Sequence, residues 1–292
     1  MLLDMSFDIK NIICSYIYNL KNAINLYNLN KDHQDNIIIR NLCDIKSIYK
    51  NKLNQQIIEQ KKYRYVEKLN ASDCEQIKNV NHMKNTLKTL NCGNESGIDQ
   101  NGILKLNLIE LYVFNNNQIK NVNNMKNTLK ILDCSWNCGI DQNGILELNL
   151  IELDVFGNIK INNVNHMKKT LKKLDCSGNS GIDQNGISEL NLIELNAYEN
   201  KKIENVNHMK NTLKILDCGR NCGIDQEGIS ELNLIELDAN DNEKIKNVNH
   251  MKETLKILCC RFNSGIDQNG ISELNLIQLD RIGNKKIKKI KI

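Results

Sequence analysis

The chain has 292 residues, of which 40% are hydrophobic and 25% charged, a composition typical of a folded protein rather than a disordered or fibrous one. No apolar stretch is long enough to span a membrane, and the start of the chain has no basic region followed by an apolar run, so we expect neither a membrane span nor a secretory signal. The net charge of +4 conceals a mildly acidic centre, because residues 66–284 carry 24 basic and 29 acidic side chains. This balance disfavours nucleic acid as a partner.

Residues 1–65 precede the repeats and show helical patterning, which continues from Ile37 to Ile58. One apolar stripe has the spacing of a helix face and consists of Ile9, Ile12, Ile13, Tyr16, Ile17 and Leu20. The segment resembles a degenerate F-box, whose first helix is matched by Ile12, Ile13, Tyr16 and Ile17 and whose second is matched by Leu26, Leu29, Asn30 and Lys31, although the usual Leu-Pro opening is absent. The resemblance implies that the apolar stripe contacts a Skp1-like adaptor of a cullin-based ubiquitin ligase. The alternative is a helical cap that covers the first repeat.

From residue 66 an apolar residue recurs every 21 residues through eleven units. These residues are Val66, Leu87, Leu108, Leu129, Leu150, Leu171, Leu192, Leu213, Leu234, Leu255 and Leu276. We number the positions of each unit as slots from this residue. Since a 21-residue unit cannot bury its apolar side alone, stacked units must share one core. Nine units carry Asn in the ninth slot, namely Asn116, Asn137, Asn158, Asn179, Asn200, Asn221, Asn242, Asn263 and Asn284.

The pattern Leu-x-x-Leu-x-Cys/Val/Ala-x-x-Asn resembles the leucine-rich-repeat family over residues 66 to about 284. The resemblance implies an α/β solenoid over residues 66–292, with parallel strands on a concave face and short turns or helices on a convex face. We expect the nine asparagines to point inward and to bond otherwise unpaired loop backbone.

Two unit types alternate, which gives a repeat of 42 residues. The first type carries Gly at one slot (Gly102, Gly144, Gly186, Gly228 and Gly270), which predicts either a positive φ or close packing there. The second type places apolar residues at three-residue spacing, as in Ile203, Val206 and Met209, which predicts an inward-facing 3₁₀-like or helical turn.

The cysteines follow the repeat rather than a pairing scheme. Cys92, Cys134, Cys176, Cys218 and Cys260 occupy the sixth, inward slot of alternate units, about 10 Å apart, which is too far for disulfides. We therefore expect reduced core thiols and a cytoplasmic location. The Cys134/Cys138 pair and the recurring histidines, such as His166, lack a complete ligand set, so we expect no metal ion and no cofactor. No catalytic motif is present, which favours a binding protein over an enzyme.

The third, fifth and seventh slots point away from the core because side chains alternate along a strand. They carry acids and aromatics, and the eighth slot adds Trp136, Arg220 and Phe262. The predicted partner-binding residues on the concave face are Glu110, Phe114, Asp133, Trp136, Glu152, Asp154, Phe156, Asp175, Glu194, Tyr198, Asp217, Arg220, Asp238 and Phe262. Stacked carboxylates and aromatics favour a basic protein or peptide as the partner. The alternative is that the Asp residues satisfy local donors and are screened by Lys130, Lys172, Lys173, Lys214 and Lys256.

Two binding functions remain open at this point. The chain is either an adaptor that recruits a target to a Skp1/cullin ubiquitin ligase, or a stand-alone protein-interaction scaffold. The combination of an F-box-like start with repeats rich in Asn, Ile and Lys is also similar to proteins of amoeba-infecting giant viruses, which would place the chain in the host cytoplasm.

Overall fold

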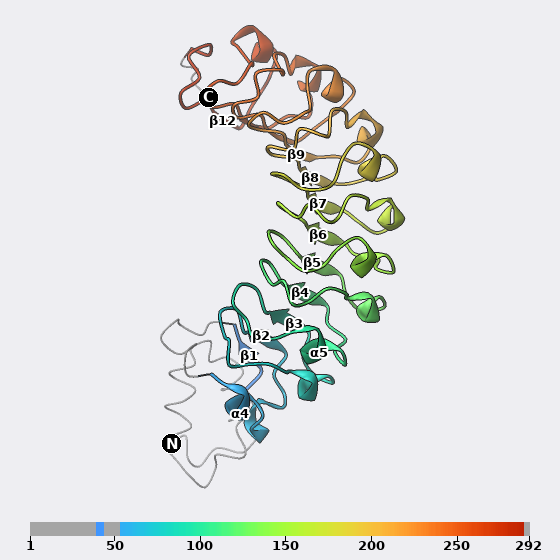
Figure 1. Ribbon diagram of the computed structural model, residues 1–292. Helices are drawn as coiled ribbons and strands as arrows, with labels where there is room; N and C mark the ends of the chain where they lie inside the picture. The colour runs from blue at the N-terminus through green and yellow to red at the C-terminus, as the bar shows by residue number, and fades with distance from the viewer. Residues whose placement is uncertain (1–38, 44–52, 289–292) are drawn as a thin grey trace, which may run out of the picture. The chain divides into compact units, whose positions relative to one another are not determined.

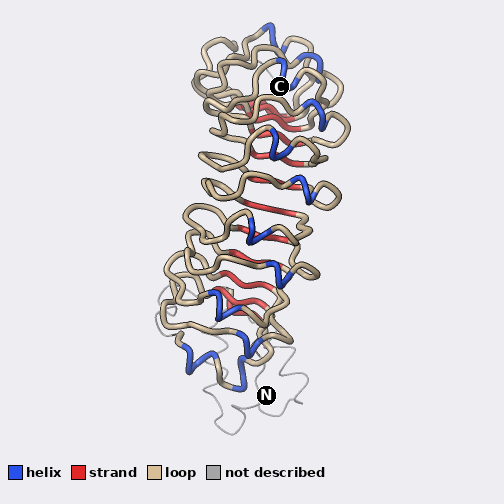
Figure 2. The backbone as a smooth tube through the Cα atoms, turned by 45° about the vertical axis from the view of Figure 1, so that its right-hand side comes forward, coloured by secondary structure: helices blue, strands red, loops and turns tan. Residues whose placement is uncertain are grey.

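The computed structural model describes residues 39–43 and 53–288. They fall into two compact units, one made of the described residues up to 133 with 137–148, the other of residues 134–136 with the described residues from 149 onward. From residue 68 onward a short strand recurs every 21 residues within each unit, and successive strands pair in parallel and in register. Each unit is therefore a leucine-rich-repeat solenoid, with strands along one side and short helical turns along the other (Figures 1 and 2).

The strands are three residues long except for the first. The strands of the first unit are β1 (Asn41–Leu42), β2 (Lys68–Asn70), β3 (Thr89–Asn91), β4 (Glu110–Tyr112) and β5 (Ile131–Asp133). Those of the second are β6 (Glu152–Asp154), β7 (Lys173–Asp175), β8 (Glu194–Asn196), β9 (Ile215–Asp217), β10 (Glu236–Asp238), β11 (Ile257–Cys259) and β12 (Gln278–Asp280).

The helical turns span three or four residues. Those of the first unit are α4 (Gln55–Ile58), η3 (Lys61–Tyr63), η4 (Asn81–Met83), α5 (Gln100–Ile103), η5 (Asn123–Met125) and η6 (Asn143–Ile145). Those of the second are η7 (Asn165–Met167), η8 (Asn185–Ile187), η9 (Asn207–Met209), η10 (Glu227–Ile229), η11 (Asn249–Met251) and η12 (Asn269–Ile271). None of the helices in the described part of the chain has the length and apolarity that a membrane crossing requires.

The core lies between the strands and the helical turns. In the 21-residue repeat that starts at Leu150, the leucine itself and Val155 are 0% exposed and Leu153 is 3% exposed. On the side of the helical turns, Ile203, Val206 and Met209 of another repeat are also 0% exposed. This confirms that the turn faces inward, and the structure shows that it is a 3₁₀ helix. Each such side chain contributes roughly 1.5–3 kcal/mol through burial.

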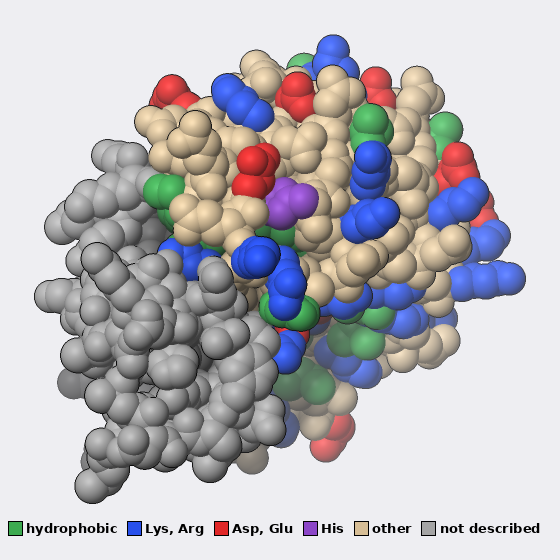
Figure 3. Space-filling view, turned by 90° about the horizontal axis from the view of Figure 1, so that it is seen from below, with side chains coloured by type: hydrophobic (Ala, Val, Ile, Leu, Met, Phe, Trp, Pro, Cys, Tyr) green, Lys and Arg blue, Asp and Glu red, His purple; other side chains and the backbone are tan. Residues whose placement is uncertain are grey.

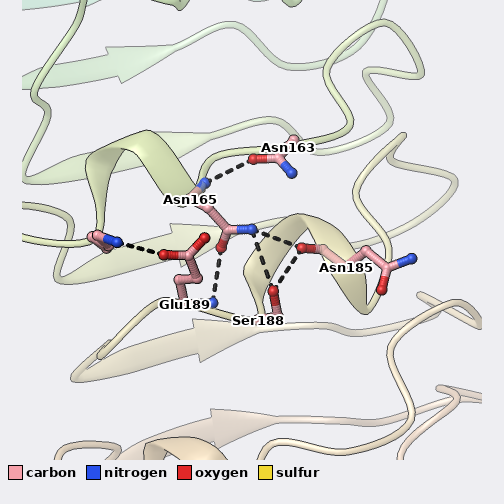
Figure 4. A network of polar contacts seen from close by, with 6 residues as sticks. Asn163, Asn165, Asn185, Ser188 and Glu189 are labelled. Carbon is pink, nitrogen blue, oxygen red and sulfur yellow. Dashed lines mark hydrogen bonds and ion pairs between the residues drawn. The ribbon is translucent and has the colours of Figure 1, made fainter.

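Asparagines join the helical turns of neighbouring repeats (Figure 4). The Asn165 side chain donates to the carbonyl oxygen of Asn185 (2.7 Å) and accepts from the backbone N–H of Glu189 (3.0 Å). Its own backbone N–H donates to the side chain of Asn163 (3.0 Å). The amide side chain thus satisfies backbone groups at helix ends that have no partner within such short helices.

The ninth-slot asparagines point inward in only one of the two alternating types of 21-residue repeat. Asn200 is buried and donates to the carbonyl oxygens of Cys176 (2.8 Å) and Ile182 (3.1 Å), as expected. Four asparagines of the other type are exposed instead: Asn137, Asn179, Asn221 and Asn263. For these four the expectation was wrong, because one more residue separates the strand from the inward side chain. A small residue at the tenth slot is buried there, as when Ser180 accepts from the N–H of Ile182 (3.2 Å).

Close packing explains the recurring glycine of the first unit type. Gly186 has no positive φ, but a Cβ atom added to it would lie 2.1 Å from the carbonyl oxygen of Asn162 in the preceding repeat. Of the two reasons that the sequence left open, only the close approach of the backbones applies.

The stack of repeats begins before the boundary expected at residue 66. Strand β1 pairs in parallel with β2, although helical patterning was expected across this part of the chain. The side chain of Gln55 accepts from the backbone N–H groups of Lys78 (2.9 Å) and Asn79 (3.0 Å), as Gln100 does one repeat pair later. Residues 39–65 therefore contain a divergent repeat, which has extra residues between its strand and its helical turn and so escapes the 21-residue phase. The F-box-like residues Ile9 to Leu20 lie outside the described residues.

Candidate partner-binding surface

The predicted site residues lie on the side of the strands that faces away from the core and in the turn that follows each strand. We call this side of each unit the strand face. Glu110, Phe114 and Asp133 belong to the first unit and are half-buried. The others belong to the second unit, where Trp136, Arg220 and Phe262 are exposed. Those that are half-buried are Glu152, Asp154, Phe156, Asp175, Glu194, Tyr198, Asp217 and Asp238.

In the second unit, the fifth-slot Asp and Asn side chains cap the ends of their own strands, whereas Cys259 does not. Asp217 accepts a hydrogen bond from the backbone N–H of Gly219 (3.0 Å), and Asp154 accepts one from Phe156 (2.8 Å). Asn196 makes the same bond with Tyr198 (3.0 Å). The alternative expectation, that these residues satisfy local donors, is therefore confirmed. Because an amide can make the same bond, the bond by itself does not explain why most of these slots carry a carboxylate.

The fifth-slot side chains of the second unit lie in register on neighbouring strands and form a row of carboxylates that Asn196 and Cys259 interrupt. The pKa values of the carboxylates differ along this row. The pKa of Asp217 is raised to about 6, mainly by burial and to a smaller extent by the carboxylates of Asp238 and Asp175, while the hydrogen bond from Gly219 lowers it. Burial also raises the pKa of Asp238. At the end of the row, the Arg261 guanidinium holds the pKa of Asp280 below its usual value. Among the described residues, Asp217 has no cationic partner, so the middle of the row is where a basic group would be stabilised most.

Of the five lysines expected to screen the aspartates, only Lys173 forms ion pairs within the described residues, and its partners are third-slot glutamates. Lys173 lies between Glu194 (3.3 Å) and Glu152 (3.9 Å) on the neighbouring strands. The expected screening by the other lysines is wrong, because within the described residues none of Lys130, Lys172, Lys214 and Lys256 forms an ion pair. These four occupy the second slot, which does not share the face of the third and fifth slots.

The seventh-slot aromatics rest against the backbone of a neighbouring repeat. A Cβ atom added to Gly178 would lie 3.1 Å from the ring of Phe156, and one added to Gly219 would lie 3.1 Å from the ring of Tyr198. Phe156 also meets Trp136 edge to face, with ring centroids 4.5 Å apart and an interplanar angle of 67°. The indole of Trp136 remains 56% exposed. The pair therefore presents to solvent an aromatic surface whose orientation is fixed by the contact between the two rings.

The backbone of the eighth slot is left-handed in all eleven 21-residue repeats, which was not predicted from the sequence. Its occupants are Asp73, Asn94, Asn115, Trp136, Gly157, Gly178, Glu199, Arg220, Asp241, Phe262 and Gly283. Gly, Asn and Asp adopt this conformation readily, and their recurrence in the slot was the available signal. Trp136 (φ 58°) and Phe262 (φ 53°) do not, and each carries strain on the order of 1–2 kcal/mol.

Arg220, the third large residue in this slot, is held by its neighbours. Its guanidinium lies 3.0 Å from Glu199 and donates to the hydroxyl of Tyr198 (3.4 Å). The arginine therefore meets acidic and aromatic groups of the preceding repeat, and the strand face carries a local example of the basic–acidic–aromatic contact predicted for a partner.

The cysteines and histidines serve the fold. The thiol of Cys176 is 0% exposed and donates to the carbonyl oxygen of Asn196 (3.5 Å), and burial raises its pKa. Cys176, Cys218 and Cys260 form no disulfide within the described residues. His208 and His250 each lie 3.1 Å from a carbonyl oxygen of the preceding repeat through Nε2. In the described ranges, no group of three or more His, Cys, Asp or Glu side chains is placed to hold a metal ion.

Comparisons with solved structures find distant likenesses. A chain in the crystal structure of the Rad7 and Elc1 complex in yeast aligns over 97% of this chain and 90% of its own length, with 16% sequence identity and a TM-score of 0.48. An internalin (inlF) from Listeria monocytogenes aligns over 75% of this chain and 76% of its own length, with 21% identity and a TM-score of 0.47. No protein-family model and no curated protein matches the sequence. The fold assignment rests on the strand pairing and core of this chain itself.

Proposed function

We propose that this protein is a binding scaffold whose strand face, in the second unit, holds a basic segment of another protein. The observation that carries the proposal is Trp136, a large aromatic side chain that is 56% exposed and occupies a strained backbone position. Strain that packing does not require is characteristic of functional positions. Phe262 repeats the arrangement with 52% exposure, and exposed aromatics anchor many protein interfaces.

The acidic row supplies the charge preference. Asp217 and Asp238 ionise at a cost because they are partly buried next to one another, so a lysine or arginine that approaches them gains more than it would at a solvated carboxylate. The aromatic pair supplies an apolar anchor and a cation–π surface. A segment with basic residues is therefore the favoured partner.

The test is selection from a random peptide library with the full-length chain as bait, followed by affinity measurements on the selected peptides. Enriched peptides are expected to be rich in Lys and Arg. Phe156→Ala should weaken their binding by about 2 kcal/mol, or about thirtyfold. Asp154→Asn should have a smaller effect on affinity and should reduce the salt dependence of association.

Lys168→Ala serves as the control, because Lys168 pairs with Glu189 on the side of the helical turns, away from the strand face. It should leave peptide binding unchanged. Selection of acidic peptides, or binding that is lost in Lys168→Ala and kept in Phe156→Ala, would overturn the assignment of this surface.

We also propose a finer function, in which the scaffold delivers its bound protein to a Skp1/cullin ubiquitin ligase. The resemblance of Ile12, Ile13, Tyr16 and Ile17 to the first helix of an F-box supports it. Co-expression of the full-length chain with a Skp1-like protein should give a stable complex that Ile13→Asp disrupts while the melting temperature stays the same. If no complex forms with the correctly folded chain, the stand-alone scaffold is the remaining function.

A further inference from the structure

A second surface lies where the chain enters each strand, one residue after the buried leucine of the first slot. In the second unit, the second-slot residues alternate between isoleucine and lysine. We call them the Ile–Lys row: Ile151, Lys172, Ile193, Lys214, Ile235, Lys256 and Ile277. Each backbone N–H donates to the carbonyl oxygen of the preceding member, as from Ile193 to Lys172 (2.8 Å) and from Lys214 to Ile193 (2.9 Å). The row is thus as regular as the strands, with about 4.8 Å per step.

The isoleucines of this row are exposed although the adjacent residues are buried. Ile151, Ile193 and Ile235 are 43%, 45% and 47% exposed, whereas the leucine immediately before each of them is 0% exposed. Ile277 reaches 74%. Because all of them occupy one slot of paired repeats, they form a line of apolar side chains rather than scattered surface residues. Such lines on soluble proteins mark interaction sites.

The lysines of the row are left without partners, unlike those on the side of the helical turns. There, Lys168, Lys210 and Lys252 each pair with a glutamate of the next repeat. Within the described part of the chain, Lys172, Lys214 and Lys256 form no ion pair and no side-chain hydrogen bond. Basic side chains are also spread over the described surface seen from the end near α4 (Figure 3). The row therefore offers positive charges two steps, or about 10 Å, apart, which an anionic partner would neutralise.

We propose that the Ile–Lys row docks an amphipathic helix of a partner protein, one face of which carries acidic and apolar residues alternately. A helix with such residues three or four positions apart advances about 5.2 Å per step. Over the six steps of the row the accumulated mismatch is only about 2.4 Å. An extended strand advances about 6.7 Å between residues on one face, so it loses phase within two steps. Charge favours acids opposite the lysines, and the exposed isoleucines favour apolar residues between them.

The experiment uses the full-length chain and a labelled synthetic peptide of about 22 residues with Glu and Leu alternating at three- and four-residue spacing, followed by fluorescence anisotropy. There are two control peptides. The first has the same composition with Glu and Leu alternating at two-residue spacing, and the second keeps the helical spacing but carries Lys in place of Glu. The helical acidic peptide should bind in a salt-dependent manner. The control peptides should bind at least about tenfold more weakly.

The test variant combines Lys172→Glu, Lys214→Glu and Lys256→Glu, which should weaken binding of the helical acidic peptide at least about tenfold. A matched triple variant, Lys201→Glu, Lys246→Glu and Lys285→Glu, makes the same change of charge at exposed lysines outside the row and should change affinity less than about twofold. Ile193→Ser combined with Ile235→Ser should also weaken binding without lowering the melting temperature.

Three results would overturn the proposal. Equal loss in both lysine triples would show a non-specific charge effect, and equal binding of the peptide with two-residue spacing would exclude a helix. The third is adsorption of the chain to phosphatidylserine vesicles, lost in the row triple, without binding of the helical peptide, since this would show a lipid-binding surface. The strand-face variant Phe156→Ala should leave binding of the helical acidic peptide unchanged. Failure of this proposal can therefore be distinguished from failure of the strand-face proposal.

Discussion

Replacing Asp217 with Asn tests whether the acidic row is held together at an electrostatic cost. The pKa of Asp217 rises to about 6 in the folded protein through burial and through the neighbouring Asp238 and Asp175, against an ordinary value of about 3.9 in an unfolded chain. Two pKa units correspond to about 3 kcal/mol, and solvent screening of the part-exposed carboxylate reduces this to about 1–2 kcal/mol. The capping bond is kept in the variant, because Asn196 makes the same bond in its own repeat.

The sign follows from proton binding. Because the folded-state pKa is the higher one, the folded protein binds this proton more tightly than the unfolded chain does. Stability from this group is therefore greatest below about pH 4, falls as the pH rises towards 6, and is level above it. Asp217→Asn should be more stable than the wild type by about 1–2 kcal/mol at pH 7.5, and this gain should disappear near pH 4.

Urea unfolding followed by circular dichroism at both pH values measures the effect, with the midpoint as the readout and the m-value as a check on the unfolding mechanism. Asp280→Asn is the matched control. The Arg261 guanidinium lowers the pKa of Asp280, so its contribution to stability is present above its ordinary pKa and is lost on acidification. Asp280→Asn should therefore destabilise the protein at pH 7.5. If Asp217→Asn has the wild-type midpoint at pH 7.5, or keeps its gain at pH 4, the electrostatic reasoning is refuted.

Four further substitutions test the fold and the strand face. Gly186→Ala should lower the free energy of unfolding by at least about 1–3 kcal/mol because the new methyl group meets a carbonyl oxygen, whereas Gly157→Asn, at a left-handed position, should change it by less than about 0.5 kcal/mol. Cys176 should resist maleimide in the native protein and react in denaturant, and rapid labelling of the native protein would show that the core was assigned to the wrong side of the strands. Cys176→Ser should lower the free energy of unfolding by an amount on the order of 1–3 kcal/mol. Trp136→Asn should relieve backbone strain, raising the melting temperature slightly, while it weakens binding of the selected basic peptides; a lower melting temperature with full binding would contradict its proposed role.

The repeat phase made much of this protein predictable from sequence. An apolar residue every 21 residues identifies the first slot, and the alternation of side chains along a strand then assigns Leu153 and Val155 to the core and Asp154 to the strand face. The inward cysteines and the 3₁₀ turn ending at Met209 follow from the same phase. These predictions hold because each repeat contacts only its neighbours, so the register of one repeat determines that of the next.

Contacts between adjacent repeats decided the remainder. The outward turn of Asn179 depends on where the chain turns inward after the strand, which differs between the two repeat types by one residue. The packing requirement at Gly186 and the left-handed backbone at Trp136 depend on how each turn passes its neighbouring repeat. The divergent repeat before residue 66 escaped detection because extra residues break its phase. Similarly, residue type does not show that Lys173 pairs with two glutamates while Lys172 beside it pairs with none. A side chain's charge is written in the sequence, but its partners are set by the direction in which the backbone points it, and that direction is a property of the stacked repeats.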